Sequence, residues 1–130
     1  MLKVTFLYHS AFLVELSHCS LLFDWYGGAI PAFDRHKPLY VFSSHHHGDH
    51  YSPEIFSLLG MDNVWYVLAN CIRLSVKRKA ALGIEETHVL RVSAGRTFLL
   101  EELRITTFRS TDAGVAFLVE TEGKTLFHAG

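Results

Sequence analysis

The sequence has little of what marks secreted, membrane-spanning or nucleic-acid-binding proteins. It contains two cysteines, Cys19 and Cys71, outside any CxxC pattern, which argues against a disulfide-stapled secreted domain. The N-terminus lacks the apolar core of a signal peptide, and no apolar run approaches the roughly 20 residues of a membrane-spanning helix. The net charge of −1 gives no general attraction to nucleic acid or to acidic membranes. We therefore expect a cytoplasmic protein that does not bind membranes and has no general affinity for nucleic acid.

The composition is that of one globular domain. The chain has 130 residues, enough for a single core but not for two, and 49% of them are hydrophobic. Its unusual feature is nine histidines, several of which lie close together. Histidine is the commonest metal ligand and proton carrier near neutral pH, so this cluster requires a chemical explanation.

Hydrophobic patterning predicts many strands and two helices. The first helix is expected over 55–59, after Ser52 as N-cap and Pro53 at the first helical position, with Gly60 ending it. A second, amphipathic helix is expected over 71–82. A hairpin turn is predicted at Glu122–Gly123. Strands are predicted at 3–8, 11–16, 20–25, 39–43, 64–69, 88–92, 96–100, 103–108, 115–121 and 124–129. Strands with helices between them indicate an α/β layered domain.

The segment that carries chemistry is Ser44-His-His-His-Gly-Asp-His50. In extended backbone, residues two apart face the same side with Cα atoms roughly 6.5–7 Å apart, so His45 and His47 can converge on one metal ion. We expect Gly48 to allow a sharp turn that brings Asp49 and His50 to a second ion. The helix after Pro53 points its N-terminal end towards this loop, which favours an anionic group there.

The alternative is a histidine-rich surface loop. A lone histidine would favour that interpretation, but four ligand-type residues at this spacing, between a buried strand and a helix, favour metal binding. His46 is the exception, because alternation turns it to the other side, and we interpret it as structural or exposed.

The motif His-x-His-x-Asp-His after a buried strand resembles the signature of the metallo-β-lactamase superfamily. Its ligand positions are here His45, His47, Asp49 and His50. The segments His9-Ser-Ala-Phe-Leu-Val-Glu15 and Leu21-Leu-Phe-Asp24 resemble the opening hairpin of the branch that includes L-ascorbate-6-phosphate lactonase-like proteins. Gly123-Lys-Thr-Leu-Phe-His-Ala-Gly130 resembles the strand that, in the family, leads into an aspartate bridging both metals.

The resemblance implies an αββα sandwich that binds up to two divalent ions. Zinc is expected, with iron or manganese as alternatives. It further implies hydrolysis of a small-molecule ester, lactone or phosphodiester by a metal-held hydroxide, with Asp49 as both a ligand and the catalytic group that handles the proton of the attacking water.

Two further residues have open roles. Asp24 resembles the family's buried carboxylate that orients a ligating imidazole, and the alternative is a turn residue at a strand end. His9 either supports the pocket or is a satisfied structural histidine. We assign no function to His18, His36, His88 or His128.

The sequence also departs from the family pattern. The third histidine for the first metal is missing from 108–114, where Asp112 or Ser110 is a candidate replacement ligand, or else part of a turn or cap. The bridging aspartate is expected just after Gly130 and a final histidine later. We therefore expect residues 1–130 to be an incomplete sandwich, the first half plus part of the second, truncated at the C-terminus and prone to self-association.

Two rival functions remain open. One is a catalytically incomplete metal-binding fragment whose ion supports folding. The other is a nuclease, which the near-neutral charge and the lack of a basic, aromatic-rich patch disfavour.

Overall fold

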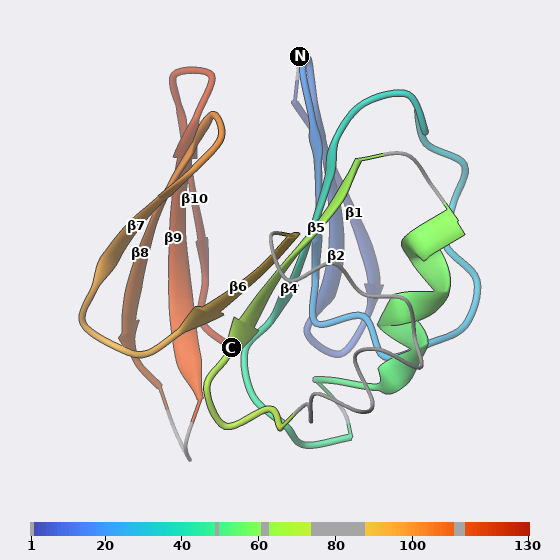
Figure 1. Ribbon diagram of the computed structural model, residues 1–130. Coiled ribbons are helices and arrows are strands. Elements are labelled where there is room, and N and C mark those ends of the chain that lie inside the picture. The colour runs from blue at the N-terminus through green and yellow to red at the C-terminus, as the bar shows by residue number, and fades with distance from the viewer. Residues whose placement is uncertain (1, 49, 61–62, 74–87, 111–113) are drawn as a thin grey trace.

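The chain folds into two β-sheets packed face to face (Figure 1). The computed structural model describes residues 2–48, 50–60, 63–73, 88–110 and 114–130. The strands in these ranges are β1 (Leu2–Tyr8), β2 (Ala11–Leu16), β3 (Ser20–Phe23), β4 (Leu39–Ser43), β5 (Val64–Ala69), β6 (Val89–Val92), β7 (Thr97–Leu100), β8 (Leu103–Arg109), β9 (Val115–Thr121) and β10 (Lys124–His128). They confirm the predicted strands, with bounds that differ by two residues at most.

The larger sheet mixes two kinds of pairing. Its order is β1-β2-β3-β4-β5-β6, antiparallel across the first three strands and parallel from β3 to β6. The smaller sheet, β10-β9-β8-β7, is antiparallel throughout. Its last hairpin turns at Glu122 and Gly123 as predicted, with φ values of 52° and 73° that suit a two-residue turn with both central residues left-handed. Because β3 to β6 are parallel, their carboxyl ends lie at the same edge of the sheet, which brings the residues that follow these strands close together.

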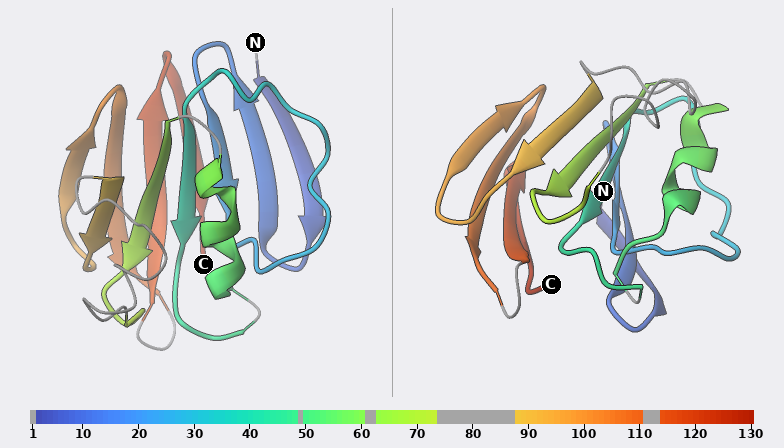
Figure 2. Two further views of the ribbon diagram at one scale, coloured as in Figure 1. Left: turned by 45° about the vertical axis from the view of Figure 1, so that its right-hand side comes forward. Right: turned by 60° about the horizontal axis from the view of Figure 1, so that its bottom comes forward.

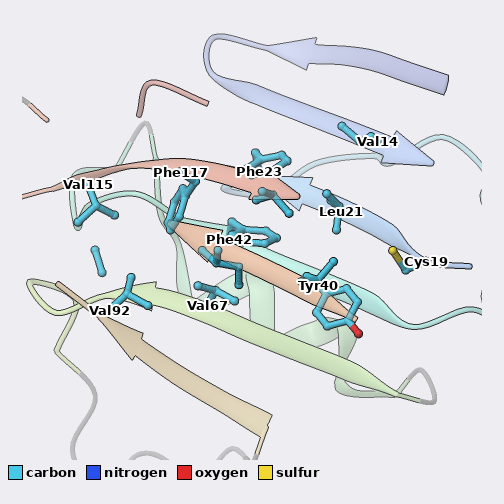
Figure 3. Close-up of a cluster of buried hydrophobic side chains, with 14 of the residues drawn as sticks. Val14, Cys19, Leu21, Phe23, Tyr40, Phe42, Val67, Val92, Val115 and Phe117 are labelled. Atoms are coloured by element: carbon cyan, nitrogen blue, oxygen red, sulfur yellow. The ribbon is translucent and has the colours of Figure 1, made fainter. Parts of the chain in front are cut away.

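The space between the sheets is filled by side chains that alternate along each strand. From the larger sheet come Val14, Leu21, Phe23, Tyr40, Phe42 and Val67, and from the smaller Ile105, Val115, Phe117 and Val119. Figure 3 shows this core, with Val115 near one end of it and Cys19 near the other. Two residues at opposite ends of one packed layer thus mark the two edges of the sandwich.

The other face of the larger sheet is covered by a helix. Leu22, Val41 and Tyr66 point to this side and pack with Ile55 and Phe56 of η1 (Pro53–Gly60). Figure 2 shows η1, in green, against this sheet on the side away from the smaller one. Strand β4 is buried on both faces, as its continuous apolar run predicts.

The helical predictions had mixed outcomes. The first helix starts at Pro53 as expected and the Ser52 hydroxyl accepts a hydrogen bond from the Glu54 amide at 3.2 Å, but the segment is a 3₁₀-helix. The predicted helix over 71–82 lies largely outside the described residues. Within the described residues, no helix is both long and apolar enough to cross a lipid bilayer.

Candidate metal centre

The candidate site lies where the parallel strands β3 and β4 end. Their register pairs Phe23 with Phe42, and the Asp24 amide donates to the Phe42 carbonyl at 2.8 Å. The residues that follow both strands, Asp24 on one and Ser44 on the other, are therefore neighbours. Ligands of open parallel sheets bind outside the carboxyl ends of the strands, and this edge is that location.

Asp24 is the buried anchor of the site. Its side chain is fully buried, and its backbone is left-handed at a φ of 48°, a region that Asp tolerates better than most residues. Oδ1 accepts the Ser44 amide at 2.7 Å, and Oδ2 accepts the Ser44 hydroxyl at 2.6 Å. Oδ2 also contacts Nδ1 of His50 at 2.7 Å. A buried carboxylate requires such compensation, and it has three partners here.

The contact between Asp24 and His50 determines what His50 can do. Because a carboxylate can only accept, the proton of this hydrogen bond lies on Nδ1. In the neutral imidazole Nε2 is then the nitrogen that can bind a metal, the arrangement by which carboxylates orient metal-ligating histidines. This is the contact that the orienting interpretation of Asp24 requires.

Three imidazoles gather beside this anchor. The ring centroids of His45 and His50 are 3.8 Å apart, and those of His45 and His47 are 4.8 Å apart. His45 is buried, His50 partly buried and His47 exposed, so the group extends from the core to the solvent. His46 is exposed, in agreement with its exclusion from the ligands. Asp49 lies outside the described residues, so its role stays a prediction.

The backbone reasoning about the motif was partly wrong. The chain bends at His46 and His47 instead of staying extended, and the His47 carbonyl accepts the amides of His50 at 2.9 Å and Tyr51 at 3.0 Å. These two hydrogen bonds make the turn. Gly48 does not have a left-handed φ, and a Cβ there would meet nothing within 4 Å. The turn therefore needs no glycine for conformational reasons.

The smaller sheet contributes residues that the sequence analysis missed. The Val115 amide donates to the Ser44 carbonyl at 2.9 Å, which joins the two sheets at the site. A Cβ at Gly114 would lie 2.6 Å from both Cβ of His45 and the Ser44 carbonyl oxygen, so only glycine fits. No local pattern marks Ser44 or Gly114, because their importance arises from contacts between distant segments.

The remaining candidates are His9, Ser110 and Asp112. His9 is exposed in the β1–β2 turn, with a φ of 42° and its ring 6.3 Å from that of Tyr26, and its role stays a prediction. The Ser110 hydroxyl donates to the Ala129 carbonyl at 3.0 Å. Asp112 lies outside the described residues.

Ser44 could suggest a serine hydrolase, because it adjoins an Asp and a His. Its side chain is fully buried, however, and its hydroxyl donates to Asp24. A nucleophile must reach its substrate, and this buried hydroxyl cannot, although it also lies 3.3 Å from Nδ1 of His45. Ser44 instead holds Asp24 in place.

A second group of potential ligands lies at the opposite edge of the sandwich. One ligand atom from each of Cys19, Glu102 and Glu122 falls within 4.8 Å of the others. Burial raises the pKa of the Cys19 thiol far above its ordinary value, and a hydrogen bond to Glu102 and the nearby carboxylate charges raise it further. Because metals bind the thiolate, an ion here would have to displace the thiol proton.

Solved structures share this architecture. A metallohydrolase from Ignicoccus hospitalis aligns with a TM-score of 0.69 and 18% identity, over 99% of this chain and 60% of that one. A protein from Thermotoga maritima, described as a zinc-dependent hydrolase of the metallo-β-lactamase superfamily, gives 0.51 and 14%, over 100% and 49%. The diiron β-hydroxylase CmlA from Streptomyces venezuelae gives 0.64 and 12%, over 98% and 29%. The chain has the metallo-β-lactamase fold, as its motif predicted.

Sequence comparison gives a consistent result. No protein-family model matches the chain. A "UPF0173 metal-dependent hydrolase" from Desulforamulus reducens is 29% identical over an alignment that covers 99% of this chain. The chain spans 61% of the length of this relative. The sequence thus resembles that of a metal-dependent hydrolase, and the fold is the metallo-β-lactamase fold.

Proposed function

We propose that this chain provides the metal centre of a metal-dependent hydrolase. The observation that carries the proposal is the gathering of His45, His47 and His50 at the end of β4, with His50 held through Nδ1 by buried Asp24. The donor set suits a divalent ion, because imidazole nitrogens bind zinc and iron well, and the carboxylate of Asp49 would add the oxygen ligand that manganese prefers. Zinc is the expected ion, and the similarity to a diiron enzyme makes iron the first alternative.

The chain's own residues would divide the work at the site. A divalent ion lowers the pKa of bound water, which supplies a hydroxide near neutral pH. His45 and His47 would hold one ion and Asp49 with His50 a second, with Asp49 also accepting the proton of the attacking water. Asp24 and Ser44 fix the orientation of His50 without touching the substrate. The substrate class proposed is a small-molecule ester, lactone or phosphodiester.

Two features support the remaining expectations about the protein. Cys19 and Cys71 are both free, which agrees with the proposed cytoplasmic location, where thiols stay reduced. Leu2, Val4 and Phe6 are exposed on β1, at the edge of the larger sheet. An apolar sheet edge of this kind supports the proposed self-association.

Metal content tests the proposal directly. We expect the purified parent protein to carry zinc or iron, and the double variant His45→Ala/His47→Ala to lose more than about 100-fold in metal affinity, beyond the 10–100-fold typical of losing an outer contact. His46→Ala is the matched control, because His46 adjoins both ligands but is exposed. Equal metal in the parent and the double variant would refute the site.

Turnover separates the enzyme from the alternative, a metal-binding fragment. We expect metal-loaded protein to hydrolyse an activated ester or a phosphodiester such as bis(p-nitrophenyl) phosphate, and to lose this activity on chelation and in His45→Ala/His47→Ala. Metal binding without turnover on either substrate would instead assign the chain a folding-related metal.

A further inference from the structure

A second feature at the metal-centre edge is a polar pocket between the two sheets. It has a volume of about 370 Å³ and is lined by Asn70 after β5, Val92 to Ala94 at the end of β6, and Arg109, Gly114 and Val115 of the smaller sheet. Gly114 also forms the wall beside His45, since a Cβ there would touch that imidazole's Cβ. The pocket is therefore adjacent to the candidate metal centre.

Arg109 belongs to the inner face of β8. Along this strand Leu103, Ile105 and Thr107 are buried between the sheets, and alternation places Arg109 on the same face. It is directly opposite Val115 in the β8–β9 register, and the Val115 amide donates to Ser44. Arg109 is therefore the cross-strand neighbour of the residue whose amide contacts Ser44 at the site. Arg109 is the last residue of β8, and it is exposed.

The pocket's chemistry is that of an anion site. Arg109 supplies a permanent positive charge, and Asn70 and Ser93 add an amide and a hydroxyl that can donate. Among the described residues that line the pocket there is no carboxylate. The planar guanidinium presents paired donors that match carboxylate and phosphate oxygens. A glycine wall lets a ligand in this pocket approach His45 closely.

We propose that Arg109 binds an anionic group of the substrate, a carboxylate or a phosphate, while the bond to be cleaved lies at the metal centre. The inference rests on the proposed function, which it deepens by assigning the substrate an anionic group beside the scissile bond. Arg109 is then a specificity residue: it positions the substrate and takes no part in proton transfer.

The test measures anion binding on chelated, metal-free protein by isothermal titration calorimetry, with inorganic phosphate and acetate as probes. We expect at least one ion to bind the parent, and Arg109→Gln to weaken that binding about 10- to 100-fold, the loss typical of a charge-assisted hydrogen bond. Stronger binding of phosphate than of acetate assigns a phosphate, and the reverse assigns a carboxylate.

Two control variants test whether the loss of anion binding is specific to the guanidinium of Arg109. Arg104→Gln removes the same charge from the other end of the same strand, where Arg104 is outward-facing and 3.8 Å from Glu120, and its anion binding should match that of the parent. Arg109→Lys keeps the charge without the fork and should bind between the parent and Arg109→Gln. Thermal unfolding checks that each variant is folded.

The failures are separable from those of the metal site. If the parent binds neither ion, if Arg109→Gln binds as well as the parent, or if Arg104→Gln weakens binding equally, the anion site is wrong. None of these outcomes changes the metal content of the parent, which tests the proposed function independently.

Discussion

The two edges of the sandwich carry two groups of potential metal ligands that differ in protonation. At one edge, Cys19 lies close to Glu102 and Glu122, but burial raises the pKa of its thiol and two carboxylates oppose its ionisation. At the other edge, the imidazole of His50 donates through Nδ1 to the carboxylate of Asp24, so Nε2 is the nitrogen that would bind a metal. Proximity of ligand atoms is thus not a sufficient criterion, because a metal at the first edge would have to displace the thiol proton.

Substituting Asp24 is expected to give the largest effect on this comparison. Asp24→Asn keeps the shape of the fully buried side chain, and Asn tolerates the left-handed backbone at this position. The substitution replaces one charged acceptor oxygen by an amide NH₂ group, which cannot accept a hydrogen bond. We expect metal affinity to fall about 10- to 100-fold, as for other contacts that orient ligands. Titration with zinc against a chromogenic chelator measures it.

The corresponding change at the other edge is Cys19→Ser. We expect it to leave metal affinity unchanged, because the thiol holds its proton and is hydrogen-bonded to carboxylates. An equal loss of metal in Cys19→Ser and Asp24→Asn would refute the prediction that only the histidine cluster binds the metal.

Gly114→Ala tests the wall that the smaller sheet contributes. The added methyl meets His45 and the Ser44 carbonyl oxygen at 2.6 Å, and backbone atoms cannot move aside without cost. We expect a loss of about 1–3 kcal/mol in the free energy of unfolding, typical of an overpacked site. Urea unfolding measures it, with Gly48→Ala as the control because its methyl would meet nothing. Equal stability of the two variants would contradict the predicted clash.

The smallest change in stability is expected from Glu122, at the edge away from the candidate ligands His45, His47 and His50. Burial alone would raise the pKa of Glu122, but hydrogen bonds from the amides of His18 at 2.9 Å and Ser17 at 3.0 Å lower it below its ordinary value of 4.5. A lowered folded-state pKa gives stability that is fully present above the unfolded value and is lost as pH falls through the folded one.

We therefore expect Glu122→Gln to destabilise the protein at pH 7 by less than about 1 kcal/mol, because the group is partly exposed. The difference should shrink as the pH falls below 4.5. Urea unfolding of both proteins from pH 7 to pH 3 measures it. A difference that grows towards low pH would have the wrong sign and would contradict the assignment.

Much of the fold could be predicted from local pattern. Alternation and apolar runs predicted the strands, including doubly buried β4, because burial is encoded residue by residue. The same reasoning failed at Gly48, where two hydrogen bonds to the His47 carbonyl make the turn that was attributed to glycine. A glycine in a sequence does not reveal its φ.

The site could be predicted only in part. The histidine spacing predicted that the candidate ligands lie together, because they are within a few residues of one another in the sequence. The contact between Asp24 and His50 depends on the parallel pairing of β3 with β4, and the role of Gly114 depends on how the second sheet packs. Sequence resemblance suggested the first, but nothing local indicated the second.

The hydrogen bond from the Val115 amide to the Ser44 carbonyl has a consequence for folding. It belongs to the main chain on both sides, so of all residues only proline at position 115 would lack the donor. It joins segments about seventy positions apart in the sequence. Closing so long a loop is entropically expensive, which places this contact late in assembly. The imidazole cluster therefore gains its final wall only once both layers have closed, and exchange of the Val115 amide proton with solvent requires them to separate.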